Sequence, residues 1–277
     1  MIHDRKNLAL LFLQPILIAF LIIMVFVHSA PLYEITDLVD SDIELSQQVM
    51  ASGDYDKNVE NGKHEAKRMK DMGMSVAMMI FTAIWLGTSN SIREIVKELA
   101  IYKRERLVNL KVGPYLMSKI FIMAIICLLQ TLILVSMVTV GLGLPKFSAN
   151  VFAFFIIAMA SVMMGLAVSA AVSNSDKAMS LAPVLLVPQI ILSGAMVPIA
   201  SVKPEIFQKI FYLAISKWGY ELVGGGILDI NNRVMVDEKM AAFQGPFAGH
   251  WWILAAFIVI FYFISAQNLL RKDKEEV

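Results

Sequence analysis

Long apolar runs separated by shorter polar segments dominate the pattern of the chain. A membrane-spanning helix needs about 20 apolar residues, because each residue adds about 1.5 Å across a hydrocarbon core of about 30 Å. Six stretches meet this length, and only Lys119 and His250, each near the start of its stretch, bring a basic group into them; none contains Asp or Glu. The pattern therefore predicts an all-α integral membrane protein with six transmembrane helices. The predicted spans are residues 8–27, 73–91, 118–140, 150–172, 178–199 and 250–270.

Composition agrees with this class of protein. The 277 residues are 58% hydrophobic and 17% charged, with a mean hydropathy of +0.67. Soluble domains carry roughly a quarter charged residues. Cys127 is the only cysteine, and the four histidines are scattered along the chain. Neither a disulfide framework nor a metal-binding motif is predicted.

The positions of Lys and Arg predict the orientation of the spans. Basic residues gather before the first span, in the 93–119 segment and after the sixth span. Such residues favour the cytoplasmic side. We therefore expect both termini and the 93–119 segment to be cytoplasmic, in a bacterial inner membrane. The acidic 34–71 segment falls on the opposite side.

Two segments are predicted to lie outside the cytoplasm. Residues 31–71 are polar and rich in Asp, which indicates an outer loop. A solvated connector and a functional lid are both compatible with this composition. Residues 203–228 mix aromatic and apolar residues with a few charges, which indicates an outer re-entrant helical hairpin. Trp218 and Tyr220 are expected at headgroup depth.

The segment 93–112 differs most from its surroundings. In "SIREIVKELAIYKRER", apolar residues recur at helical spacing from Ile92 to Tyr102, between charges of both signs. This pattern predicts an amphipathic cytoplasmic helix that continues from the second span. A basic loop that contacts anionic lipid is one interpretation. The interleaved glutamates and the apolar stripe favour the other, a docking surface for a soluble partner.

Four motifs in order resemble one transporter family. They are "DRKNLALLFLQPILIAFLI", "REIVKELAIYKRERLVNLKVGPYLMSK", "SNSDKAMSLAPVLLVPQIILSGAMVP" and "ISKWGYELV". Together they resemble the membrane domain of type-2 ABC exporter permeases, in particular the G subfamily of the white and pleiotropic-drug-resistance type. The resemblance covers nearly the whole chain and is weakest across residues 31–71 and 229–249.

The resemblance implies an ATP-driven exporter in which this chain is the permease and not an enzyme. The chain has no G-x-x-x-x-G-K-[ST] motif, so we expect ATP and Mg²⁺ on a separate ATPase subunit or domain and no cofactor on this chain. The other expected partners are a second permease copy or homologue and the lipid bilayer, without nucleic acid. Residues expected to couple to the ATPase are Arg93, Glu94, Lys97, Glu98, Leu99, Tyr102, Lys103, Arg104, Glu105 and Arg106.

The resemblance also implies a substrate path between the second and fifth spans of two protomers. It assigns Leu86, Ser89, Val187 and Ile190 to this path, and Ala195 and Met196 to an outer gate. Ordinary packing between spans is the alternative for each residue. Because the predicted lining is apolar, we expect a lipid-like or amphipathic cargo.

The sequence also bears on other functions that a membrane protein of this kind could have. An ion-coupled carrier or channel is the main alternative, but such pathways usually use charged residues inside the spans. An intramembrane enzyme would need a catalytic motif such as H-E-x-x-H, which the sequence lacks. The sequence is also compatible with a purely structural membrane subunit.

Overall fold

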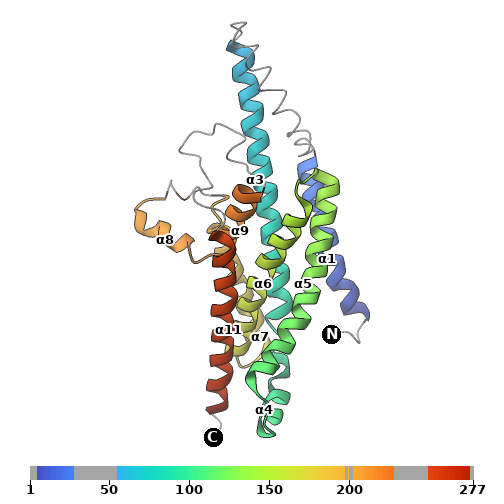
Figure 1. The fold of residues 1–277 in the computed structure, drawn as a ribbon, viewed down its shortest axis with the longest axis vertical. Helices are drawn as coiled ribbons and strands as arrows, with labels where there is room; N and C mark the ends of the chain where they lie inside the picture. Colours follow the sequence, from blue (N-terminus) through green and yellow to red (C-terminus); the bar gives the residue numbers. More distant parts are fainter. Residues whose placement is uncertain (1–4, 28–54, 197–198, 200–201, 228–248, 275–277) are drawn as a thin grey trace.

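The protein is a bundle of long helices. The computed structural model describes residues 5–27, 55–196, 199, 202–227 and 249–274, and all regular secondary structure within these residues is helical (Figure 1). In this part of the chain, five helices are long and apolar enough to cross a membrane. They are α1 (Arg5–Phe26), α3 (Tyr55–Ser91), α5 (Val112–Leu142), α6 (Phe147–Ala171) and α11 (His250–Lys274).

The predicted fifth span corresponds to a shorter helix. α7 (Ser175–Ile191) has 17 residues, or about 26 Å, which is less than the hydrocarbon core requires. The Asn174 side chain caps its start by accepting a hydrogen bond from the Lys177 backbone N–H over 2.8 Å. The helix ends before Gly194, whose φ of 81° lies in the left-handed region. The six-span count therefore stays a prediction.

The second helix is much longer than its predicted span of 73–91. α3 has 37 residues, about 55 Å, and Figure 1 shows its first turns extending beyond the other helices. Residues 55–71, predicted as part of an outer loop, thus form a helix that is continuous with the second span. Residues 31–54 of that loop lie outside the described residues.

Close packing of α3 against α6 forms the centre of the bundle. α6 also packs against α5 and α11, and most of its side chains are buried. Small residues permit the α3–α6 approach: a Cβ added at Gly87 would lie 2.5 Å from the Ala158 carbonyl oxygen. One added at Gly165 would lie 2.1 Å from Ser91 Oγ. Such small residues are typical of tight helix pairs in membranes, where van der Waals contact replaces the hydrophobic effect.

Short helices occupy the two ends of the bundle. α4 (Leu99–Leu107) lies at the same end as the C-terminus, and α8 (Gln208–Phe211) and α9 (Ile215–Tyr220) lie toward the other end (Figure 1). α9 and the π-helix η5 (Glu221–Ile227) pack among α3, α6 and α11. Short helices thus fill the range predicted as a re-entrant hairpin, and their depth in a membrane stays a prediction.

Candidate functional site

The charged segment between α3 and α5 forms a compact bend, which we call the elbow (residues 92–111). α3 ends at Ser91, and a turn leads into the 3₁₀-helix η2 (Val96–Glu98) and then α4. The chain bends because the Glu94 N–H bonds to the Ser91 carbonyl, three residues back, over 3.0 Å. The predicted helix that continues from the second span is thus interrupted here by a turn and by η2 before α4 begins.

The apolar stripe of the elbow faces the protein's own core. Ile92, Ile95 and Val96 are buried, and Tyr102 is only 1% exposed. The Tyr102 ring packs against that of Tyr115 on α5, with centroids 4.9 Å apart. Leu99 packs on the same core. Tyr102 thus attaches α4 to α5, whereas the sequence analysis expected Leu99 and Tyr102 to couple to the ATPase.

A serine on α6 fixes the turn of the elbow. Ser169 Oγ lies 3.0 Å from the backbone nitrogens of both Ile95 and Val96 and accepts hydrogen bonds from both. Ser169 is fully buried, and these two N–H groups lie at the start of η2, where the first N–H groups of a helix have no partner within it. The turn is therefore bonded directly to the central helix α6.

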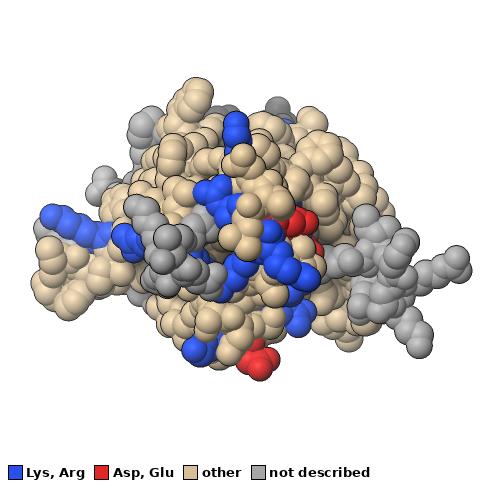
Figure 2. Space-filling view, turned by 90° about the horizontal axis from the view of Figure 1, so that it is seen from below, with Lys and Arg blue, Asp and Glu red and all other residues tan. Residues whose placement is uncertain are grey.

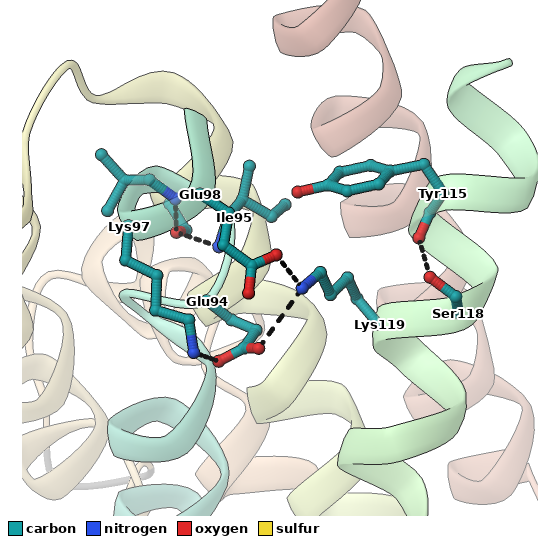
Figure 3. Close-up of polar contacts among 9 residues, drawn as sticks. Glu94, Ile95, Lys97, Glu98, Tyr115, Ser118 and Lys119 are labelled. Atoms are coloured by element: carbon teal, nitrogen blue, oxygen red, sulfur yellow. Dashed lines mark hydrogen bonds and ion pairs between the residues drawn. The ribbon is translucent and has the colours of Figure 1, made fainter. Parts of the chain in front are cut away.

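A lysine on α5 holds the acidic groups of the elbow. Lys119 Nζ pairs with Glu98 and lies 3.5 Å from Glu94 Oε1. Lys97 Nζ lies 2.6 Å from the other Glu94 oxygen (Figure 3). The negative charges of the two glutamates are thus balanced by the positive charges of the two lysines. The side chains of Glu94 and Lys119 are largely buried. Glu94 and Glu98 thus pair with lysines of this same chain, although both were expected to couple to the ATPase.

The outer surface of the elbow is basic, with an apolar tip. Leu107, the last residue of α4, is 88% exposed, and Val108, which follows it, is 80% exposed. Figure 2 views this end and shows blue Lys and Arg side chains outnumbering red acidic ones. The exposed residues of the elbow that carry charge are Arg93, Lys97, Arg104, Glu105 and Lys111, while Lys103 and Arg106 are half-buried.

Sequence reasoning missed four residues of this site. Ser169 and Lys119 lie on other helices, and no local pattern connects them to the elbow. The sequence did contain a feature that could have identified Lys119, because it is a lone charged residue at the edge of an apolar stretch. Leu107 and Val108 follow the predicted amphipathic stripe, and only the fold shows that they form its exposed tip.

The residues predicted to line a substrate path lie in different surroundings. Leu86 is buried in the core, and Ser89 is half-buried. Val187 and Ile190 are exposed on α7, 50% and 38% respectively. Within the chain, α3 packs in part against α7, whereas the predicted path lies between two protomers. In the predicted gate, Ala195 is half-buried and Met196 is exposed.

An apolar groove lies beside this region, between α1 and α3. Its volume is about 380 Å³, and Thr82 is the one polar residue in its lining. The Thr82 hydroxyl already donates to the Met78 carbonyl over 2.8 Å, so the groove surface is apolar. Trp85, next to the predicted Leu86, lines the groove and is 50% exposed. Within the described residues, no cluster of His, Cys, Asp or Glu could hold a metal ion.

These features define an integral membrane protein whose central helices are bonded to a charged elbow at one end. Residues 1–228 match the family model described as ABC-2 type transporter, so the chain belongs to this family. It is also 27% identical over 157 residues to the ABC transporter ATP-binding/permease protein Rv1747 of Mycobacterium tuberculosis. That match covers 53% of this chain and 18% of the relative, so the chain spans less than a fifth of the relative's length.

Proposed function

We propose that this chain is the permease subunit of an ATP-driven exporter, and that its elbow receives the motion of a partner ATPase. One observation supports this most: the elbow is bonded to α5 through Lys119 and to α6 through Ser169, and it follows directly from α3. A force applied to its surface would therefore move three long helices together. The match to an ATP-binding/permease protein supports an ATPase partner, which would hold ATP and Mg²⁺.

The docking surface is the exposed part of the elbow. Leu107 and Val108 would enter an apolar groove of the ATPase, because well-buried apolar anchors supply most of the energy of an interface. Arg93, Arg104 and Glu105 would set orientation and register, as charges at the rim of an interface do. The buried Glu94 and Tyr102, together with the half-buried Glu98, would transmit motion without touching the partner.

A second permease copy would face α7, in the arrangement of the G subfamily. Val184, Val187 and Ile191 are at least half exposed on this helix. Ser89, Val187 and Ile190 would then border the substrate path, with Leu86 supporting it from the core. Ala195 and Met196 would form the outer gate. The apolar groove beside Trp85 supports a lipid-like or amphipathic cargo. The elbow and both termini would be cytoplasmic, in the inner membrane.

Purification of the intact complex tests this function. Tagged chain, extracted in mild detergent, should bring with it a polypeptide that carries a phosphate-binding loop and hydrolyses Mg²⁺-ATP. Leu107→Glu should lower the recovered ATPase by roughly tenfold or more. Leu213→Glu is the control, because Leu213 is 73% exposed between α8 and α9, away from the elbow.

The outcomes separate the candidate functions. Recovery of the ATPase with the wild type and the control, but not with Leu107→Glu, supports the exporter. Purified, active chain that transports its cargo without any ATPase would overturn the proposal and favour an ion-coupled carrier or channel. Equal recovery with both variants would show that the tip of the elbow is not the docking surface.

A further inference from the structure

A buried cluster of charges lies in the part of the chain between α8 and α11. Glu221 Oε2 lies 2.9 Å from Lys217 Nζ and 3.1 Å from His250 Nε2. All three side chains are at most 5% exposed. Lys217 comes from α9, Glu221 begins η5, and His250 is the first residue of α11. One carboxylate oxygen thus joins the short helices to the last transmembrane helix.

Aromatic rings complete the surroundings of the lysine. Lys217 Nζ lies 3.5 Å from the centre of the Trp218 ring and 4.1 Å from that of Tyr212. The Trp218 ring is also 5.3 Å from that of His250, and its indole N–H donates to the Tyr212 carbonyl over 3.0 Å. Cation–π contacts therefore replace part of the water that Lys217 loses on burial.

A second polar contact connects the same short helix to α7. The side-chain oxygen of Gln189 accepts a hydrogen bond from the Ser216 backbone N–H over 3.0 Å. The Gln189 backbone carbonyl accepts another from the Ser216 hydroxyl over 2.5 Å. Ser216 is fully buried and precedes Lys217 directly. Two sets of polar contacts thus meet at the neighbouring residues Ser216 and Lys217, one leading to α7 and the other through Glu221 to α11.

Stability alone does not explain this cluster. Removing two charges from water costs several kcal/mol per ion, and well-packed apolar residues often replace a buried ion pair without loss of stability. An ion pair differs from such packing in its geometry, because it fixes which groups face each other. The cluster therefore fits a role in holding the short helices at one position between α7 and α11.

We propose that Glu221 is a positioning residue of a latch (Gln189, Ser216, Lys217, Glu221 and His250) that makes the end of α7 move together with α11. α7 ends at Ile191, two residues after Gln189, and the predicted gate residues Ala195 and Met196 follow. The latch thus sets the position of the segment that closes the outer side. Its role in transport rests on the proposed function, whereas its existence does not.

Cysteine labelling tests the latch in the full chain. Ala214 precedes α9 and is 1% exposed, so Ala214→Cys in a Cys127→Ser background should react slowly with a membrane-impermeant maleimide. Glu221→Gln leaves the Lys217 charge without its partner, and labelling should rise about five- to thirtyfold. Adding Lys217→Met to Glu221→Gln removes both charges, so the double variant should label more slowly than the single one.

Two further variants keep the test independent of general damage. His250→Gln retains a hydrogen-bond donor toward Glu221 and should label near the background rate, whereas His250→Ala should label faster. Glu98→Gln breaks an ion pair in the elbow and should leave labelling at position 214 unchanged. Unchanged labelling in Glu221→Gln, or equal rates for the single and double charge variants, would overturn the latch.

A transport assay tests separately whether the latch affects transport. In proteoliposomes that contain the complex with its ATPase, Glu221→Gln should lower the amount of cargo moved per ATP hydrolysed. If labelling rises while this ratio stays at the wild-type value, the latch exists but does not control the gate, and that part of the proposal is wrong. If no ATPase accompanies the chain, the proposed function fails while the labelling result still stands.

Discussion

The side-chain amide of Gln130 on α5 donates a hydrogen bond to the backbone carbonyl of Leu11 on α1 over 2.9 Å. Leu11 lies four residues before Pro15, which has no N–H to bond this carbonyl within the helix. The Gln130 oxygen accepts a hydrogen bond from the Asn90 amide of α3 over 2.7 Å. One side chain thus satisfies the carbonyl left free by a proline and connects the first three long helices.

Replacing this side chain should destabilise the bundle. Gln130→Leu leaves the Leu11 carbonyl and the Asn90 amide without these bonds, and we expect the free energy of unfolding to fall by about 1–2 kcal/mol. Equilibrium unfolding in mixed micelles measures the change. Gln267→Leu is a matched control, because Gln267 is an exposed residue of α11.

Pro15→Ala gives this interpretation a stricter test. Alanine restores an N–H that can bond the Leu11 carbonyl inside α1, so part of the contribution of Gln130 becomes redundant. The double variant Pro15→Ala/Gln130→Leu should therefore lose less stability than the sum of the two single variants. Strict additivity would show that the two sites are independent.

The long helices were the most predictable part of the fold. Stretches of apolar residues without acidic groups have few structures open to them in a membrane, and α1, α5, α6 and α11 overlap their predicted spans. Which face of a long helix is buried was not predictable, because lipid and protein core are both apolar, and α3 is an example. Leu86 and Trp85 show this: the buried Leu86 was assigned to the substrate path, while its neighbour Trp85 is half exposed.

In the elbow, too, the sequence pattern did not determine what the apolar residues contact. Its apolar stripe is buried within the chain, but a sequence pattern does not say which protein supplies the other side. Tyr102 meets Tyr115, and the turn meets Ser169, more than 70 residues further along the chain. Contacts of this kind depend on how α5 and α6 pack, which periodicity within one segment does not encode.

Ser169→Ala tests the bond between the elbow and α6. Two buried backbone N–H groups would lose their acceptor, and we expect a loss of about 1–3 kcal/mol in unfolding free energy. The control is Ser161→Ala, a buried serine of the same helix whose hydroxyl bonds only within α6, to the Ile157 carbonyl. Hydrogen exchange at Ile95 and Val96 should rise in the first variant and not in the second.

Lys119→Met tests the charge balance of the elbow. The variant removes the base that Glu94 and Glu98 share and leaves the buried Glu94 with Lys97 as its partner, so the negative charges of the elbow are no longer balanced. We expect the stimulation of ATP hydrolysis by cargo to fall in the purified complex, with a smaller change in the basal rate. Lys111→Met removes an exposed charge from the same elbow and is the control. Equal stimulation in both variants would argue that Lys119 has no part in coupling.

Gly87→Ala tests how closely α3 and α6 approach. The added Cβ would lie 2.5 Å from the backbone carbonyl oxygen of Ala158, which cannot rotate away as a side chain can. The two helices would have to separate, and overpacking of this kind costs about 1–3 kcal/mol. The matched control is Gly113→Ala, whose Cβ would meet only the Tyr262 hydroxyl at 3.8 Å, an ordinary contact distance. Thermal unfolding in detergent should therefore move to lower temperature for Gly87→Ala and stay near the wild-type value for Gly113→Ala. Equal shifts in the two variants would mean that the cost lies in the glycine-to-alanine change itself and not in the α3–α6 contact.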